Sequence, residues 1–264
     1  SSRTRCASCC TRFVTFPFLL HLGPLTLHPH LVFEALGYAT GYLVYRALRA
    51  RTQDPIPEKT RWIVLTAAAV GAALGSRVVF WLDDPALTWA HRGEFAFWLG
   101  GKSIVGGLLG GWLLVEWAKR RVGETRATGD LYVVPLAVGL ALGRIGCFLT
   151  GLADHTYGNP TTLPWGIDFG DGVHRHPTQL YESVFALGVA LLAYRIGKTR
   201  AWRAGVLFLG FVIAYLLYRV ALETIKPGPF FYTGLDGIQV ACLVGAAYAL
   251  WRLQRLVSSP GAPT

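Results

Sequence analysis

The sequence predicts an all-α polytopic membrane protein with seven transmembrane helices, its N-terminus outside and its C-terminus in the cytoplasm. Two observations predict this class. Hydrophobic residues make up 53% of the 264 residues and charged residues only 15%, against about 25% in a typical soluble domain. The mean hydropathy of +0.41 leaves too few polar side chains to cover a soluble surface. The composition therefore excludes a disordered chain and disfavours a soluble enzyme.

Seven apolar stretches are long enough to cross a hydrocarbon core of about 30 Å. All are rich in Ala, Leu, Val and Gly and are too long for strands, so each is predicted to form one helix. In chain order they cover residues 30–49, 61–82, 95–118, 131–150, 178–196, 203–224 and 235–253. They define a membrane domain over residues 21–255, between an N-terminal tail (1–20) that we expect to be flexible and a C-terminal tail (256–264).

The basic residues are distributed unevenly over the connections. Fifteen of the 25 Lys and Arg residues follow the first, third, fifth and seventh stretches, and six lie on the opposite side. Because cytoplasmic loops carry the excess of Lys and Arg, this asymmetry predicts the orientation stated above. The net charge of +10 thus indicates topology, and no nucleic-acid partner is expected. The remaining four basic residues are embedded in apolar stretches: Arg77, Lys102, Arg144 and Arg219.

The cysteines indicate neither a disulfide framework nor a metal site, and we expect no cofactor. Three of them crowd the N-terminus without a second ligand pair at zinc spacing: Cys6, Cys9 and Cys10. Cys147 and Cys242 lie in apolar surroundings, which favours inert buried thiols. An activated thiol at Cys147, beside an embedded arginine, is the alternative.

One outer connection, residues 151–177, is long and rich in Gly, Pro, Asp and His. Loops of this length without secondary structure are usually functional or disordered. Its aromatic residues Tyr157, Trp165 and Phe169 are suited to the headgroup level of a membrane. We therefore expect an external loop or lid.

Two embedded arginines are the main functional candidates, because a charge inside an apolar helix costs several kcal/mol. Arg144 lies in the glycine-rich segment GLALGRIGCF, and Arg219 lies in LLYRVALE with Glu223 one turn later. A guanidinium binds a phosphodiester through two parallel hydrogen bonds and stays charged. The pattern predicts a lipid-phosphate site that opens outward. The alternative is an Arg219–Glu223 pair that neutralises itself within the bundle.

The segment His176-Pro177-Thr178-Gln179-Leu180-Tyr181-Glu182 begins the fifth predicted helix at its outer end. Proline is favoured at the first position of a helix. Gln179 and Glu182 are one turn apart, and we expect their polar groups to point toward the arginines. The alternative is a helix cap in which Glu182 favours the helix dipole.

Three of these segments, GRIGCF (143–148), RHPTQLYE (175–182) and LLYRVALE (216–223), resemble motifs of the bacterial prolipoprotein diacylglyceryl transferase family. Weaker matches, from LGPLTL (22–27) to GLDGIQ (234–239), follow the family's order over most of residues 20–253. The resemblance implies a seven-helix enzyme of the bacterial inner membrane with an active site that opens outward. Such enzymes move the diacylglyceryl group of phosphatidylglycerol to a lipobox cysteine thiol and release glycerol phosphate.

The resemblance also assigns residues, with Arg144 and Arg219 at the family's essential arginines. Together with the residue analysis, it gives catalytic candidates at Arg144, Arg219, Glu182, Glu223, His30 and His155. The candidates for substrate binding are Arg77, Gly143, Cys147, His176, Gln179, Tyr181 and Gln239.

The sequence departs from the family where the acceptor would be deprotonated. The family's HGG motif reads Val105-Gly106-Gly107, so its histidine is absent, and a family tyrosine is replaced by His30. Both asparagines and the glutamate that follow the GRxG motif are also replaced, by Cys147, Thr150 and Leu152. A thiol attacks as the thiolate and needs a base. The candidates for that base are His28, His30, His155, His174, His176 and Glu34.

These features favour a divergent transferase that takes a diacylglyceryl or related group from phosphatidylglycerol. The acceptor is left open between a lipoprotein cysteine and a hydroxyl or amine of another lipid or small molecule. The alternative is a non-catalytic lipid-binding membrane subunit, which the missing histidine favours and the retained charges oppose. A small-molecule transporter is disfavoured because no inverted repeat or pair of broken helices is found.

Overall fold

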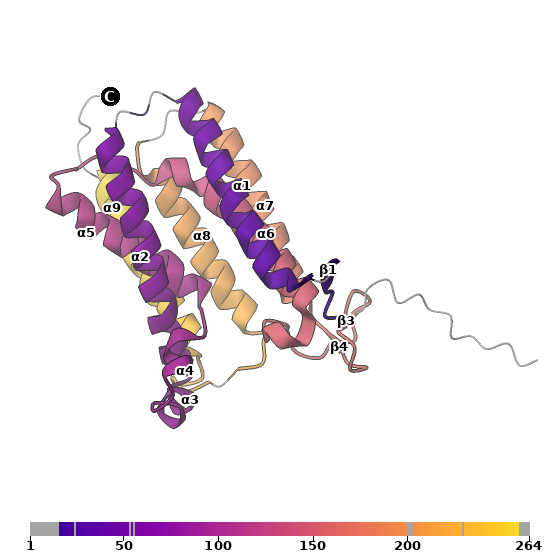
Figure 1. Cartoon of the computed structure of the whole chain (residues 1–264). Helices are drawn as coiled ribbons and strands as arrows, with labels where there is room; N and C mark the ends of the chain where they lie inside the picture. The colour runs from indigo at the N-terminus through magenta and orange to yellow at the C-terminus, as the bar shows by residue number, and fades with distance from the viewer. Residues whose placement is uncertain are drawn as a thin grey trace, which may run out of the picture.

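The computed structural model describes residues 16–23, 25–52, 54, 56–199, 203–228 and 230–258. Within them, seven helices of 18 or more residues form one bundle (Figure 1): α1 (Pro29–Arg51), α2 (Glu58–Asp83), α5 (Ile104–Arg121), α6 (Val133–Thr150), α7 (Thr178–Thr199), α8 (Val206–Glu223) and α9 (Gly237–Ser258). Five of these, α2, α6, α7, α8 and α9, are long and apolar enough to cross a membrane. The predicted all-α, polytopic membrane class is thereby confirmed, whereas the seven spans and the orientation stay predictions.

The predicted helix over 95–118 is wrong. After the short helix α3 (Pro85–Ala90), the chain forms α4 (Phe95–Leu99) and then leaves the helical path before α5. Gly101 has a φ of +60°, a left-handed conformation that only glycine adopts without steric cost. The Ser103 side chain then accepts a hydrogen bond from the Gly106 N–H at 3.3 Å and caps the start of α5.

The remaining short elements are two hairpins, β1 (Leu20–Leu22) with β2 (Leu25–Leu27) and β3 (Ile167–Asp168) with β4 (His174–Arg175), and two 3₁₀ turns, η1 (Asp130–Tyr132) and η2 (Gly151–Asp154). The hairpins, α3 and α4 lie at the same end of the bundle (Figure 1). Phe169, in the long loop over residues 151–177, is only 2% exposed. Its ring packs against Phe16 and Phe148, with centroids 5.0 and 5.8 Å away. The loop is therefore anchored on the end of α6, while Trp165 stays exposed.

The predicted tails fall largely outside the described residues, and so do Cys6, Cys9 and Cys10. Phe18, at the C-terminal end of the predicted N-terminal tail, donates its backbone N–H to the Leu149 carbonyl at 3.0 Å. This part of the chain is thus tied to the end of α6.

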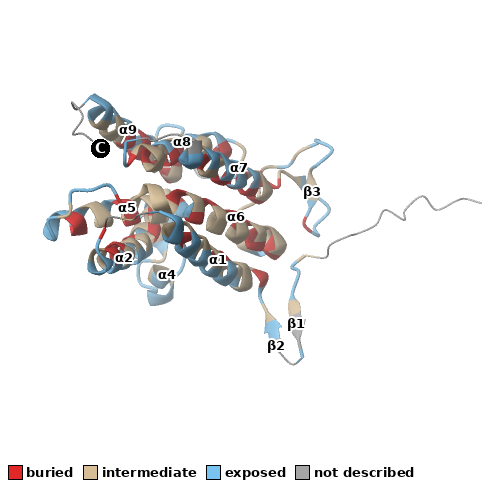
Figure 2. Ribbon diagram, turned by 90° about the horizontal axis from the view of Figure 1, so that it is seen from above, coloured by how far each residue is buried: buried red, intermediate tan, exposed pale blue. Residues whose placement is uncertain are grey.

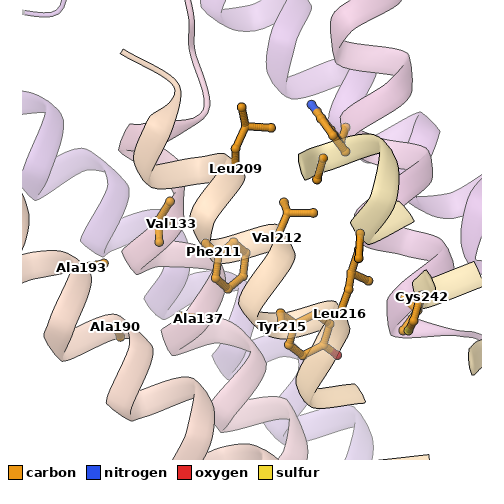
Figure 3. Close-up of a cluster of buried hydrophobic side chains, with 14 residues drawn as sticks. Val133, Ala137, Ala190, Ala193, Leu209, Phe211, Val212, Tyr215, Leu216 and Cys242 are labelled. Carbon is orange, nitrogen blue, oxygen red and sulfur yellow. The ribbon is translucent and has the colours of Figure 1, made fainter. Parts of the chain in front are cut away.

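The long helices form two groups. In one group α1 packs along α6 and α6 along α7, and in the other α2 packs along α5 and α8 along α9. Close contacts between backbones are few across the boundary, and they run mainly through α8, which lies between the groups in Figure 1. Large side chains of α8 pack across this boundary. Phe211, Tyr215 and Leu216 form a buried cluster with small residues of α6 and α7 (Figure 3): Ala137, Ala190 and Ala193.

The outward faces of the bundle are apolar and exposed (Figure 2). They carry large side chains from several of the long helices: Leu31, Tyr38, Leu43, Leu74, Leu113, Val184, Leu187, Leu191, Leu192, Leu217 and Val244. A soluble monomer rarely exposes so much contiguous apolar surface. These side chains are placed as expected for contact with lipid tails.

Glycine allows a close contact between α2 and α5, as small residues do in membrane bundles. A Cβ atom added at Gly75 would meet the Gly106 carbonyl oxygen and would lie 2.8 Å from Gly110 Cα. Neither atom belongs to a flexible side chain, so the two helices would have to separate.

We expect Gly75→Ala to lower the free energy of unfolding by about 1–3 kcal/mol, the usual cost of overpacking. The matched control is Gly210→Ala on α8, where an added Cβ would meet no atom within 4 Å. Alanine should leave stability there unchanged or raise it, because its helix propensity is higher. Denaturant unfolding in detergent micelles measures both variants, and equal effects would contradict the packing explanation.

Candidate functional site

A single buried carboxylate holds the two predicted arginines together. Glu182, the fifth residue of α7, is 0% exposed. Its Oε2 accepts hydrogen bonds from Arg144 Nε of α6 at 2.6 Å and from Arg219 Nη1 of α8 at 2.9 Å. Its Oε1 accepts from the Tyr215 hydroxyl at 2.7 Å. Three helices thus meet at one side chain, and the arginines come together as predicted.

A second carboxylate and a lysine extend this cluster. Glu223 forms an ion pair with Arg219 one turn earlier on α8, and Lys226 Nζ lies 3.4 Å from Glu223 Oε1. Burial, together with the neighbouring Arg219 charge, lowers the pKa of Lys226 to about 8. With Lys226 protonated, three cations and two carboxylates leave one positive charge. Such an excess suits a site for a single anionic group.

Two donors and one acceptor in the cluster have no partner among the described residues. Arg219 Nε and both polar atoms of the Gln179 side chain are buried and make no hydrogen bond there. Gln179 is 1% exposed and lies one turn before Glu182, on the same face of α7. A buried polar group without a partner costs about 1–3 kcal/mol. The oxygen atoms of a bound ligand would accept hydrogen bonds from Arg219 Nε and from the Gln179 NH₂ group.

Beside the cluster lies a group that the sequence did not predict as a unit: His30, Cys147 and Asp154. His30 Nδ1 is 2.8 Å from Asp154 Oδ1 and 3.8 Å from Cys147 Sγ. Arg144 Nη1 lies 3.7 Å from the same sulfur. This group therefore adjoins the arginines directly. Its nitrogen, sulfur and oxygen atoms lie within 4.8 Å of one another, close enough to ligate one metal ion.

Glu34 connects the site to the break between α4 and α5. One of its carboxylate oxygens lies 3.7 Å from His30 Nε2, and the other accepts from Lys102 Nζ at 3.1 Å. The Lys102 side chain is 59% exposed, so the prediction that it is embedded in a helix is wrong. The glycine break places it in a loop, where it pairs with α1.

Other predicted residues lie outside this cluster. His155 is exposed in a left-handed turn (φ +53°), and Asp154, rather than His155, faces His30. Arg77 donates to the carbonyls of Ala73 and Leu99 at 2.9 and 3.3 Å, so it holds α4 against α2.

Four further candidates are Gln239, His176, Tyr181 and Gly143. Gln239 donates to the Val220 carbonyl at 3.2 Å and ties α9 to α8. His176 contacts the Tyr181 hydroxyl at 3.2 Å, and Tyr181 also receives a hydrogen bond from Trp165 at 2.8 Å. The position of Gly143 beside Arg144 leaves space, because an added Cβ would meet no atom within 4 Å.

A cavity of about 780 Å³ lies at the other end of the bundle, where Trp112, Phe208 and Tyr248 contribute to its lining. Phe208 is eleven residues before Arg219 on α8, which separates them by roughly 16 Å along the helix. The cavity is therefore distinct from the arginine cluster.

Sequence reasoning missed three residues of this site. Tyr215 lies one turn before Arg219 on α8, and Lys226 lies one turn after Glu223 in the connection that follows. This spacing was the available signal. Asp154 had no such signal, because its partner His30 lies 124 positions away.

Comparison with known proteins follows this geometry. The family model of prolipoprotein diacylglyceryl transferase matches residues 17–254. The phosphatidylglycerol–prolipoprotein diacylglyceryl transferase of Geobacter sulfurreducens is 34% identical over 223 residues, covering 78% of this chain and 80% of the relative. Proteins of the same name from Solidesulfovibrio magneticus and Pseudomonas aeruginosa PAO1 are both 31% identical, covering 90% and 93% of this chain and 94% and 97% of their own lengths.

Glu182 should be the most sensitive polar residue for stability. We expect Glu182→Gln to lower the free energy of unfolding by about 3–5 kcal/mol, because it removes the carboxylate that two buried arginines share and leaves Arg144 without its charge partner. Tyr215→Phe, the matched control, removes one hydrogen bond from the same carboxylate and should cost about 1 kcal/mol. Denaturant titration in micelles measures both, and a Glu182→Gln loss no larger than the Tyr215→Phe loss would contradict the shared-carboxylate role.

Proposed function

Because the chain belongs to the prolipoprotein diacylglyceryl transferase family, we propose that it transfers the diacylglyceryl group of phosphatidylglycerol to the cysteine thiol of a prolipoprotein. The chain is a multi-pass membrane transferase, as its helices and its relatives establish. The donor, the acceptor and the placement of the reaction are the proposal. The observation that carries it is the pair of buried arginines on one carboxylate, with hydrogen-bond donors to spare.

The phosphodiester of the donor lipid binds at Arg144 and Arg219. Each guanidinium has five N–H donors, and Glu182 occupies only part of each set. Arg144 Nη1, Arg219 Nε and the Gln179 amide are the groups that meet the phosphate oxygens. The open space beside Gly143 gives the headgroup room to approach, and Lys226 adds a third positive charge at the rim.

The reaction is a substitution at the glyceryl carbon that carries the phosphate ester. The acceptor sulfur forms the new S–C bond while the C–O bond to the phosphate breaks. The electron pair leaves with glycerol phosphate, and the thiol proton is released. The arginines stabilise the charge that develops on the leaving phosphate, in a site already organised before the reaction.

The acceptor is activated at His30 and Asp154. Val105, at the position of the family's histidine, is 0% exposed and lies in the apolar core, so it cannot take a proton. His30 is the histidine beside Arg144, through Cys147, and its side chain is 40% exposed. That exposure leaves room for an acceptor from outside.

The site faces the outer side of the inner membrane, and all seven long helices cross the bilayer. Arg144, Glu182 and Arg219 lie near one end of the bundle, whereas the long helices place most basic residues at the other end: Arg46, Arg49, Arg51, Lys119, Arg120, Arg121, Arg195, Lys198, Arg252 and Arg255. The positive-inside rule makes that other end cytoplasmic. Even α5, with 18 residues, spans about 27 Å, close to the thickness of the hydrocarbon core.

We expect Arg144→Lys and Arg219→Lys each to lower kcat/KM by about 100-fold or more, the usual effect of removing one preorganised donor. The assay gives purified protein phosphatidylglycerol with a labelled headgroup and a lipobox peptide, and follows glycerol phosphate and the lipidated peptide. Arg252→Lys is the matched control, because Arg252 forms an embedded pair with Glu116 at the other end of the bundle. It should change the rate by no more than about twofold.

Three outcomes oppose the proposal. If the wild type binds phosphatidylglycerol through Arg144 but releases no glycerol phosphate, the chain is a lipid-binding subunit instead. If glycerol phosphate is released but the diacylglyceryl group is found on a hydroxyl or amine acceptor, the assigned acceptor is wrong. If lysine is tolerated at both arginines, the phosphate lies elsewhere.

Lys226 should set the alkaline limit of donor binding. Its pKa is lowered to about 8, so its positive charge is present below pH 8 and is lost as the pH rises through that value. The KM for phosphatidylglycerol should therefore rise above pH 8. Arginine keeps its charge there, so Lys226→Arg should keep a low KM to higher pH, whereas Lys226→Gln should show a raised and pH-independent KM. An identical rise in the arginine variant would contradict this role.

A further inference from the structure

The group formed by His30, Cys147 and Asp154 contains three different metal-binding atoms from three elements. His30 lies on the first turn of α1, Cys147 on the last turn of α6, and Asp154 at the end of η2. Their ligand atoms lie within 4.8 Å of one another. Cys147 is 6% exposed and the Asp154 side chain is 8% exposed. Two of the ligands are thus buried, while His30 stays accessible.

The chemistry of this ligand set favours zinc. Imidazole nitrogen, thiolate sulfur and carboxylate oxygen are its usual ligands, and sites with three protein ligands keep a fourth position open for a reactant. Magnesium and calcium prefer oxygen ligands alone. A thiolate and a carboxylate together neutralise a divalent cation, which is the charge balance that a site at the edge of a membrane requires.

Neighbouring residues hold these ligands in orientation. The other nitrogen of His30, Nε2, faces the Glu34 carboxylate at 3.7 Å, and the Thr156 hydroxyl donates to the second oxygen of Asp154. A carboxylate behind a ligating histidine fixes its tautomer and raises its basicity. The guanidinium of Arg144 lies beside the sulfur and favours its thiolate form. Because Glu182 balances the charge of Arg144, a metal cation can still bind next to it.

We propose that His30, Cys147 and Asp154 bind one zinc ion, and that its fourth position takes the acceptor thiol. The second clause rests on the transfer reaction proposed above, whereas the metal site does not. A thiol that coordinates zinc is deprotonated outright, so its proton is released on binding. The zinc-bound sulfur then forms the S–C bond as glycerol phosphate leaves with the electron pair of the C–O bond. Zinc takes the place of a proton-accepting side chain, and the metal adjoins the phosphate site because Arg144 contacts Cys147.

Metal content tests the site independently of activity. The full chain is purified with three N-terminal cysteines, Cys6, Cys9 and Cys10, changed to Ser, so that they bind no metal. Its zinc content is measured by inductively coupled plasma mass spectrometry. We expect about one zinc ion per chain. Cys147→Ala and His30→Ala should lose it, whereas Cys242→Ala, which removes the other buried cysteine, should retain it.

Two further measurements separate ligation from a merely structural role. Cobalt(II) substituted for zinc should give a thiolate-to-cobalt charge-transfer band that disappears in Cys147→Ala and persists in Cys242→Ala. Glu34→Gln should weaken zinc binding by roughly 10- to 100-fold, the usual effect behind a ligating histidine, without changing the stoichiometry. Thermal unfolding of each variant shows that it is folded.

The outcomes distinguish this inference from the proposed function. If the wild type binds neither zinc nor cobalt, or if Cys147→Ala keeps its zinc, the metal site is overturned. Transfer by that metal-free protein would then leave the proposed function standing, with His30 as a plain base. If zinc binds as expected but no diacylglyceryl group is transferred, the metal site stands and the proposed function fails.

Discussion

The architecture depends on the low polarity of a membrane interior, which does not tolerate an unpaired charge. Two arginines on different helices can be buried there only if a carboxylate compensates them, and Glu182 does so for both. The sharing draws α6, α7 and α8 to one point, and Tyr215 completes the coordination of the second oxygen. The packing of this end of the bundle and the grouping of its charged side chains therefore have the same cause.

The arginine charges of this cluster are balanced, but its hydrogen-bonding groups are not all satisfied. Glu182 and Glu223 balance the charges of the two arginines, but Arg219 Nε and the Gln179 side-chain amide have no hydrogen-bond partner among the described residues. Oxygen atoms of a tetrahedral phosphate match such a set of donors. Stability in isolation and affinity for an anion are thereby balanced by the same few side chains, with Lys226 adding charge where the cluster meets the surface.

Much of the fold and half of the site were predictable from sequence, for a physical reason. Charges within apolar stretches are anomalous, so Arg144, Arg219, Glu182 and Glu223 stood out without any structure. The break before α5 did not, since the apolar run continues through it and only the backbone of Gly101 reveals it. The neighbours of His30 depend on tertiary contacts across more than a hundred residues. The sequence favours His155 over Asp154, because composition does not show which of two neighbouring side chains a left-handed turn directs toward His30.

In the proposed reaction, the boundary between the two helix groups is the route by which a phospholipid would reach this centre. A phospholipid keeps its tails in the bilayer, so its headgroup has to travel sideways between helices rather than from the water above. The tightly packed pairs, α2 with α5 and α1 with α6, do not need to separate for this passage. The ion pair between Glu182 and Arg219 crosses the boundary, and an arriving phosphate competes for that same guanidinium. For the proposed donor lipid, the ion pair that closes this sideways route would thus also be the group that recognises the headgroup.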